Sequence, residues 1–430
     1  MKIAVIGAGS TYTPELINGF LDRADHLPVK EIYLMDIDQT RLQIVAGFVQ
    51  RLIAKAGSGI RIVQSLDAAE TIDGADVVIT QLRVGQMVAR REDEYLGRKH
   101  DLVGQETTGI GGMSKALRTI PVILELCELI EKQAPQALLL NFTNPSGLVM
   151  QAIQRYAPQI KAAGVCNSAF TTKMKILQRL SEQHGVTYKP EDGELLTLGL
   201  NHLTWHFGFK LKGVDIWDEV FEAYLTLLRA MQDPPFNPDY LERQRVIPND
   251  YLEYYFHTAK KVSLQKKWPP SRAEEVLLVE KDLLAQYADP ACNRIPERLM
   301  QRGGAFYSSV ATSIIQSWWN DLGETHVANV AHQGLVRGWE KEWVLEMPCK
   351  VDHRGVQPIP TEPLPLYNYV LLEQVKQYEL LTVEAAVHGD RAAAFRALVV
   401  HPLGPTEQNA AHVLEDMLST HERFLPRFFH

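Results

Sequence analysis

The sequence predicts an α/β fold in which an N-terminal parallel sheet, wrapped by helices, packs on a C-terminal α+β domain that is mainly helical. Short β-branched runs alternate with amphipathic segments over the first 165 residues, and this alternation weakens beyond residue 167. Of the 430 residues, 46% are hydrophobic, which is enough for a large core. Because no flexible linker or repeat is evident, we predict two tightly packed domains, residues 1–166 and 167–430.

The elements of the first domain follow from residue spacing. Short apolar runs between turn residues predict strands, and apolar positions three and four apart predict helices. The predicted strands cover residues 3–7, 31–37, 60–65, 76–82, 137–142 and 160–166. The predicted helices cover residues 13–23, 40–57 and 117–133. The segment 83–112 is rich in glycine and charge, so we expect a long functional loop there.

The second domain is expected to begin with a helix at 170–184 and a strand pair at 194–200 and 208–213. Mainly helical patterns follow to the end of the chain. The longest helices are predicted over residues 305–321 and 410–425.

Composition excludes several classes of protein. The chain has 44 Lys plus Arg against 52 Asp plus Glu, a net charge of −8, which argues against nucleic-acid or anionic-membrane binding as its main role. Four cysteines without a CxxC pair make a disulfide framework and a structural zinc cluster improbable and suit a reducing cytoplasm. The first residues read as a strand rather than a signal peptide, and no apolar run is long enough to span a membrane.

A glycine-rich turn follows the first predicted strand. Gly7, Gly9 and Ser10 open a helix, where backbone N–H groups and the helix dipole can hold a pyrophosphate. Asp36 ends the second strand, the place where a carboxylate binds the ribose hydroxyls of NAD and repels the 2′-phosphate of NADP. The pattern predicts a Rossmann-like NAD domain. Tyr12 occupies the third glycine position, so the helix should pack less closely on the sheet or the turn should be built differently.

Several segments in this order resemble the signature segments of family 4 glycoside hydrolases. They run over nearly the whole chain: GAGSTYTPEL, QLRVGQ, GQETTG, NFTNPSG, GVCN, GLNHLTW and IPNDYLEYY, with weaker similarity in RGGAFYS and EMPCK. Within the family the resemblance is to the 6-phospho-β-glucosidases. It implies hydrolysis of phosphorylated β-disaccharides by an enzyme that requires NAD and a divalent metal, usually Mn²⁺, without the carboxylate pair of other glycosidases.

The mechanism implied by the resemblance oxidises the sugar transiently. NAD+ takes hydride from C3, and the ketone acidifies the C2 hydrogen so that a base can remove it. The aglycone then leaves from C1, water adds, and hydride returns to C3. The resemblance assigns Tyr251 as the base and Glu106 as the acceptor of its proton. Tyr254 and Tyr255 are expected to pack.

The resemblance also implies the binding residues. Cys166 and His202 match the metal ligands, although a thiolate and an imidazole would ordinarily suggest zinc. Arg90 and Arg272 match the arginines that bind substrate, and Asn144 matches an asparagine on the sugar hydroxyls. Arg83 is a third candidate for the phosphate.

Asn167 departs from the pattern of the family members that act on α-linked substrates, which carry Asp after the metal cysteine. An amide is no general acid, so Asn167 favours β-glycosides and leaves the leaving-group acid unidentified. The sequence also leaves open the gluco or galacto preference and the aglycone. A homodimer or homotetramer is expected by family analogy. The competing hypotheses are a 2-hydroxy-acid-type NAD dehydrogenase and a catalytically silent NAD- or sugar-phosphate-binding regulator.

Overall fold

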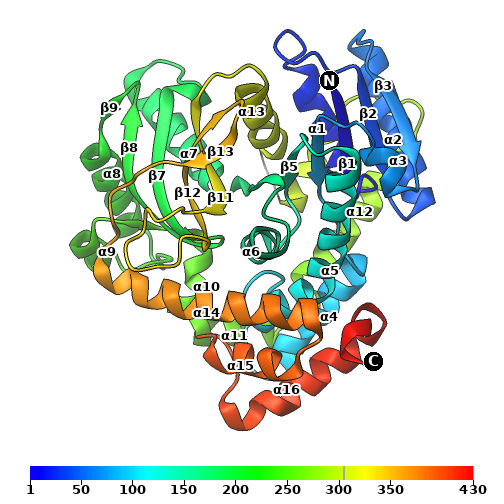
Figure 1. Cartoon of the computed structure of the whole chain (residues 1–430). Coiled ribbons are helices and arrows are strands. Elements are labelled where there is room, and N and C mark those ends of the chain that lie inside the picture. The colour runs from blue at the N-terminus through cyan, green and yellow to red at the C-terminus, as the bar shows by residue number, and fades with distance from the viewer. Residues whose placement is uncertain (304–305, 430) are drawn as a thin grey trace.

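A computed structural model describes residues 1–303 and 306–429 of the chain (Figure 1). One twisted sheet runs through the molecule. It has the strand order β3-β2-β1-β4-β5-β6-β11-β12-β7-β8-β10, and β13 and β9 pair with β12 and β8. The first six strands in this order are all parallel and the rest are antiparallel.

The parallel half confirms the predicted α/β fold of the N-terminal region. Its strands are β1 (Lys2–Ile6), β2 (Glu31–Met35), β3 (Arg61–Ser65), β4 (Val77–Thr80), β5 (Leu138–Asn141) and β6 (Lys161–Gly164). Its helices are α1 (Thr13–Leu21), α2 (Gln39–Lys55), α3 (Ala68–Ile72), α4 (Gln86–Lys99), α5 (Gly109–Gln133) and α6 (Ser146–Tyr156). β1, β4 and β5 are almost completely buried because helices cover both faces of the sheet.

The antiparallel half comes from later parts of the chain. Its strands are β7 (Gly193–Leu200), β8 (Leu203–Leu211), β9 (Val214–Asp215), β10 (Ile247–Pro248), β11 (Glu324–Ala331), β12 (Val344–Asp352) and β13 (Gly355–Pro358). Mainly helical patterns were predicted after the first strand pair, so β11 to β13 were not anticipated. In β12 eight of nine residues are buried, and a short buried run cannot be told from a helix by periodicity alone.

Helices make up most of the remaining chain. They are α7 (Asn167–His184), α8 (Trp217–Ala230), α9 (Pro238–Gln244), α10 (Glu253–Phe256), α11 (Thr258–Gln265), α12 (Arg272–Ala288), α13 (Tyr307–Trp319), α14 (Leu366–His388), α15 (Arg391–Val400) and α16 (Glu407–Thr420). Residue 305, the first of the predicted 305–321 helix, lies outside the described residues. α12 packs on α2 and α13 packs on α1, so helices from the second half of the chain cover the parallel sheet.

The predicted long loop at 83–112 is wrong, because α4 occupies residues 86–99 and α5 begins at Gly109. Asp93 and Glu94 are buried on the inner face of α4, and the helix as a whole is strongly polar, so its sequence resembles a charged loop. The glycines of α5 permit close packing: a Cβ at Gly111 would lie 2.2 Å from the Gln105 carbonyl oxygen. Glycine therefore marks a contact between backbones here and not a loop.

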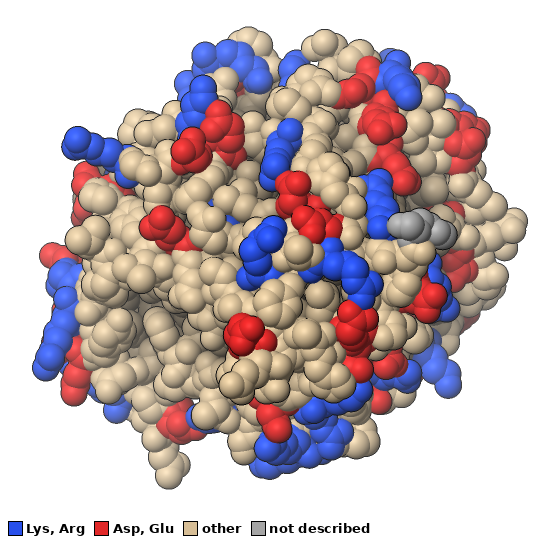
Figure 2. Space-filling model, turned by 60° about the horizontal axis from the view of Figure 1, so that its bottom comes forward, with Lys and Arg blue, Asp and Glu red and all other residues tan. Residues whose placement is uncertain are grey.

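Charge is mixed over the surface. Figure 2 shows acidic and basic side chains interspersed over the face of the molecule that it presents, with no broad field of one sign. Among the described helices, none combines the length and the hydropathy that a membrane crossing would require.

Candidate active site

One cavity of about 1150 Å³ opens at the carboxyl ends of the parallel strands and extends toward the β7–β8 turn. In doubly wound sheets this is the edge where ligands bind. The cavity brings together the thirteen residues that the sequence singled out for binding or catalysis: Gly7, Gly9, Ser10, Asp36, Arg83, Arg90, Glu106, Asn144, Cys166, Asn167, His202, Tyr251 and Arg272.

The β1–α1 turn forms one end of the cavity. Gly7 has φ +88°, and a Cβ there would lie 2.7 Å from the Leu82 Cα, so the turn needs glycine. Gly9 donates its N–H to Asp36 Oδ2 at 2.8 Å, and a Cβ at Gly9 would meet the same oxygen. The turn and the acidic residue after β2 are thus held together, as a dinucleotide cradle requires.

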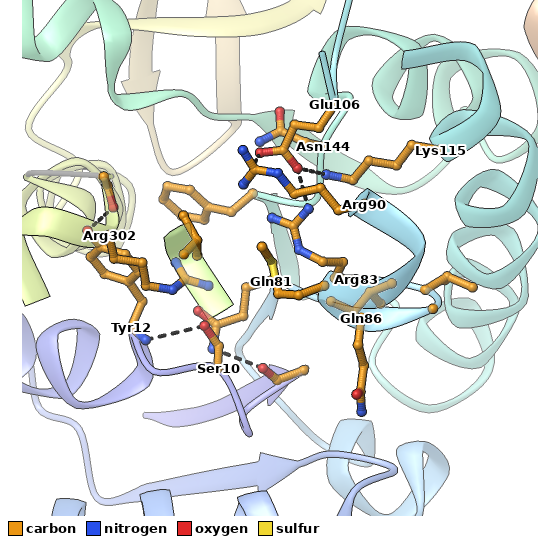
Figure 3. A pocket seen from close by; sticks show the side chains of 18 of the residues that line it. Ser10, Tyr12, Gln81, Arg83, Gln86, Arg90, Glu106, Lys115, Asn144 and Arg302 are labelled. Atoms are coloured by element: carbon orange, nitrogen blue, oxygen red, sulfur yellow. Dashed lines mark hydrogen bonds and ion pairs between the residues drawn. The ribbon is translucent and has the colours of Figure 1, made fainter. Parts of the chain in front are cut away.

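Tyr12 is buried at the third glycine position. Its hydroxyl donates to the Gly303 carbonyl, and its ring lies 5.7 Å from the Tyr307 ring and under the guanidinium of Arg302 (Figure 3). The tyrosine therefore forms part of the cavity wall.

Cys166 and His202 meet in the middle of the cavity. Cys166 follows β6, and His202 sits in the two-residue β7–β8 turn with φ +64°. Cys166 Sγ lies 3.5 Å from His202 Nε2, while His202 Nδ1 lies 2.9 Å from the Thr107 hydroxyl, which orients the imidazole. The two atoms are close enough to contact one ion, and both are metal-ligating types, so the pair fits a shared metal.

Burial sets the protonation of this pair. It lowers the pKa of His202 to about 4, which leaves a neutral imidazole able to bind a metal. Burial, together with the charge of Glu346, raises the pKa of the Cys166 thiol to about 12. A metal must therefore displace a proton from this sulfur. Neither of the two three-residue groups of metal-ligating side chains found among the described residues includes Cys166 or His202, so the rest of a coordination shell would come from substrate or water.

Tyr251 stacks flat on His202, with ring centroids 3.9 Å apart and an interplanar angle of 5°. Burial and the neighbouring Cys166 and Glu106 raise its pKa far above 10. Tyr255 packs on His401 as expected, whereas Tyr254 lines the cavity beside Tyr251. The phenol at the expected position of the base therefore needs a cation before it can lose its proton.

Three cations surround Glu106 (Figure 3). Its Oε1 lies 2.9 Å from Arg90, and its Oε2 contacts Arg83 and lies 2.7 Å from Lys115 Nζ. Burial alone would raise the pKa of Glu106, but the three cations hold it well below its usual value. Burial and Arg83 lower the pKa of Lys115 to about 7. Glu106 is therefore a weak base held in a positive cluster that suits an anion.

The other candidates lie around this cluster. Asn144, in the loop between β5 and α6, lines the same cavity as Glu106 (Figure 3). Asn167 begins α7 directly after Cys166. Arg272 begins α12 and bonds Glu275 and the carbonyl oxygen of Gln301, so it borders the cavity without joining the Glu106 cluster.

Sequence reasoning missed Lys115, Glu94, Glu280 and Glu346. Each is a charged residue buried inside a helix or strand, where composition and spacing carry no signal of a site. Glu346 accepts bonds from the side chains of Asn201 and Asn329, and burial raises its pKa to about 7. The EMPCK segment that contains Glu346 was the only available signal for it.

Comparisons with known proteins agree over nearly the whole chain. A model described as family 4 glycosyl hydrolase matches residues 2–182, and its C-terminal domain model matches residues 197–404. A probable 6-phospho-β-glucosidase of Bacillus subtilis is 37% identical, covering 100% of this chain and 98% of that protein. A maltose-6′-phosphate glucosidase of the same organism is 27% identical, covering 99% and 96%.

A solved structure is similar throughout. The 6-phospho-β-glucosidase from Thermotoga maritima, determined with manganese, NAD+ and glucose 6-phosphate, superposes with a TM-score of 0.89 at 33% identity. The similarity covers 99% of both chains.

Proposed function

This chain belongs to glycosyl hydrolase family 4, and we propose that it hydrolyses 6-phospho-β-glucosides to glucose 6-phosphate and an aglycone. The proposal depends on one observation above all: a single cavity contains a dinucleotide turn, a Cys–His pair and a cationic cluster. A simple dehydrogenase has no need of the Cys166–His202 pair. The relatives named above support the phosphorylated glucoside as substrate.

Two bound groups would supply the chemistry that side chains lack: NAD+ would accept and return hydride at C3, and a divalent ion such as Mn²⁺ would act as a Lewis acid on the neighbouring sugar oxygens. The Gly7–Ser10 turn and Asp36 would hold the dinucleotide. Cys166 and His202 would hold the ion, with Thr107 fixing the imidazole.

Tyr251 is the proposed base for the C2 proton. Its stacking on His202 places the phenol beside the metal position, where a cation would favour the phenolate. Departure of the aglycone from C1 and addition of water would follow. Because Glu106 is a weak base, we assign it the task of positioning Arg83, Arg90 and Lys115 rather than that of accepting the proton.

The cluster around Glu106 is the proposed phosphate site. Arg90, Arg83 and Lys115 provide three positive charges at one end of the sugar site, and Arg272 would contribute from the rim. Asn144 would bond sugar hydroxyls next to this cluster.

The β preference is proposed from Asn167. The amide follows the metal cysteine and cannot protonate a leaving group, so another group or water must do so. We further propose a cytoplasmic location, because Cys166 must stay reduced to bind an ion, and a homodimer or homotetramer by family analogy.

A substrate panel tests this proposal. The protein is incubated under reducing conditions with chromogenic 6-phospho-β-glucoside, its α-anomer and the 6-phospho-β-galactoside, each with and without NAD+ and Mn²⁺. We expect chromophore release from a β-anomer only when both cofactors are present, without accumulation of NADH. Activity after removal of NAD or metal would contradict the mechanism, and faster turnover of the α-anomer would contradict the anomer assignment. Lasting NADH formation with 2-hydroxy acids would favour a dehydrogenase.

A further inference from the structure

The cavity carries an arginine beside the residue that should select NAD. Arg41 lies in the first turn of α2, and its Nε donates to the Gly9 carbonyl oxygen at 3.2 Å, next to Asp36. In dinucleotide sites an acid at the end of the second strand binds the ribose hydroxyls, whereas an arginine nearby accepts the 2′-phosphate of NADP. This site therefore contains the recognition residue of each cofactor.

The guanidinium of Arg41 is already paired. Its Nη2 lies 3.2 Å from Glu280 Oε2, on helix α12 of the second half of the chain. The other oxygen, Glu280 Oε1, lies 2.8 Å from Arg302 Nη2. Burial would raise the pKa of Glu280, but Arg302 and Arg41 hold it below its usual value, so the carboxylate is charged.

We propose that Glu280 is a second determinant of NAD over NADP, because it neutralises Arg41 and adds a negative charge near the ribose. The inference depends on the NAD site of the proposed function. A 2′-phosphate in this place would have to displace Glu280 from Arg41 and approach two carboxylates, Asp36 and Glu280. Repulsion of the wrong ligand is a common source of specificity, and it needs no contact with the right one.

A purely structural role for Glu280 makes a different prediction. If the carboxylate only anchored α12 through Arg302, its removal would change stability and weaken both dinucleotides alike. NAD+ and NADP+ differ only in the 2′-phosphate, so the ratio of their dissociation constants isolates the role proposed here.

The test is calorimetric titration of the purified protein with NAD+ and NADP+, without substrate. In Glu280→Gln the affinity for NADP+ relative to NAD+ should rise about tenfold, since Arg41 becomes available to the phosphate. Asp282→Asn is the matched control on the same helix, because its exposed carboxylate pairs with Arg298; it should leave the ratio unchanged. Adding Arg41→Gln to Glu280→Gln should abolish the gain.

The outcomes separate the two proposals. If the wild type does not bind NAD+, the proposed function fails. If NAD+ binds but Glu280→Gln leaves the ratio unchanged, or the double variant keeps the gain, the role of Glu280 is refuted. If Glu280→Gln does not fold, the Asp36→Ser variant provides the test instead. Glu280 still pairs with Arg41 in this variant, so it should continue to bind NAD+ more tightly than NADP+. Tighter binding of NADP+ would contradict the inference.

Discussion

Tyr251 shows how much of the site depends on a single contact between rings. The phenol lies flat on His202, so the two side chains hold each other in place. Phenylalanine keeps this stacking and removes only the hydroxyl. Tyr251→Phe should therefore bind NAD+ like the wild type, while kcat falls by about 10²–10⁴-fold, the usual contribution of a general base. Steady-state kinetics and NAD+ titration on one preparation check this, and an unchanged kcat would remove Tyr251 from the mechanism.

Lys115 gives the cavity a pH dependence. Its pKa of about 7 arises from burial and from Arg83, and the negative charge of a bound sugar phosphate would raise it. Above pH 7, binding of the sugar phosphate should therefore be coupled to the uptake of a proton by Lys115, up to about one per site. The affinity for the sugar phosphate should fall as the pH rises from about 7 to 9. The phosphate itself titrates near pH 6, outside this window. Calorimetry of glucose 6-phosphate at pH 8, in two buffers of different ionisation enthalpy, measures the uptake.

Lys115→Met is the control for this experiment. It should bind glucose 6-phosphate more weakly and without the uptake of a proton. Equal uptake in the variant would assign the proton to another group.

At the level of single residues, the short segments singled out from the sequence come together in the structure. All thirteen candidates line one cavity, because most of them follow parallel strands whose carboxyl ends meet at one edge. Lys115 and Glu280 could not be found this way. Each becomes part of the site only because packing buries it against a charge outside its own helix: Glu106 lies 9 residues from Lys115, and Arg41 lies 239 residues from Glu280.

Helix α4 connects the two parts of the proposed phosphate site, Arg90 and the start of α12, through Glu94. This carboxylate accepts from Arg90 Nε at 2.9 Å and from the backbone N–H of Ala273 at 2.8 Å, in the first turn of the helix that Arg272 begins. It therefore positions Arg90 and also satisfies the N-terminus of α12.

Glu94→Gln should destabilise the protein by about 1–3 kcal/mol, because a buried bond to a charged group is weakened. It should also weaken glucose 6-phosphate binding more than NAD+ binding. Glu92→Gln, at a partly exposed position on the same helix that pairs with Arg91, should change stability by no more than about 0.5 kcal/mol. Denaturant titration and ligand titration of both variants test this, and equal effects at the two positions would refute it.

Each element that the sequence predicted poorly has a physical reason. α4 is strongly polar and buries Asp93 and Glu94 in ion pairs, so its sequence resembles a charged loop. β12 is buried on both sides, so it lacks the alternation of a half-buried strand. The predicted helices at 13–23 and 40–57 succeeded because α1 and α2 have one polar side. The division at residue 166 remains a prediction, since the sheet continues from β6 into β11 without interruption.

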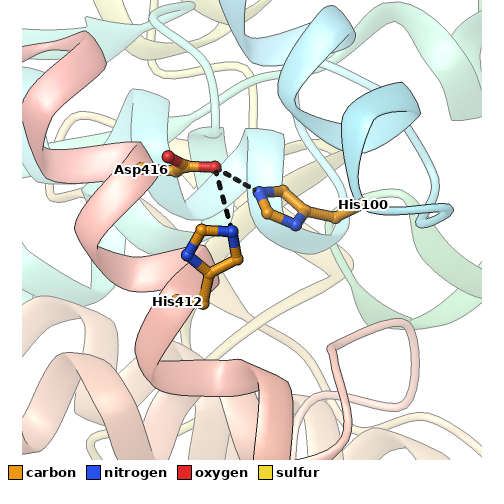
Figure 4. A group of neighbouring side chains, drawn as sticks. All are labelled: His100, His412 and Asp416. Atoms are coloured by element: carbon orange, nitrogen blue, oxygen red, sulfur yellow. Dashed lines mark hydrogen bonds and ion pairs between the residues drawn. The ribbon is translucent and has the colours of Figure 1, made fainter.

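At the scale of the whole molecule, two groups of charged side chains connect the C-terminal region to α4 and its end. One group is buried and the other lies near the surface. Asp93 is fully buried and pairs with Arg118 and with His421 Nε2 at 3.0 Å. Near the surface, Asp416 of α16 lies 2.7 Å from His100 Nε2 and 3.9 Å from His412 Nε2 (Figure 4). The same Asp416 oxygen lies 2.6 Å from Lys99 Nζ, so the outer group is an ionic link between helices.

The two links should differ greatly in energy. Asp93→Asn leaves Arg118 buried without its counter-charge and should cost about 3–5 kcal/mol. Asp416→Asn removes a partly exposed link and should cost about 0–1 kcal/mol. Denaturant titration of both variants at pH 7 measures the difference, and similar losses would contradict it.

Acid should abolish the contribution of Asp93 to the stability of the folded protein. Burial alone would raise the pKa of Asp93, but Arg118 and His421 hold this pKa below the usual 3.8. Its stabilisation is thus complete above about pH 5 and is lost as the pH falls below 4 through the pKa of the folded state. The stability gap between wild type and Asp93→Asn should therefore narrow only in that acidic range. If the difference in stability between the two proteins narrowed near pH 6 instead, the titrating group would be one other than Asp93.

The order of strands in the sheet also bears on how the protein is made. β11 and β12 lie between β6, which precedes Cys166, and β7, which precedes His202. A ribosome therefore synthesises both proposed metal ligands well before it synthesises the two strands that connect their parts of the sheet. Such long-range pairing is a slow step in folding. A nascent chain that ends before residue 352 would accordingly carry the thiol and the imidazole without the strands that connect them, and we expect it to bind a metal only after β12 has been synthesised.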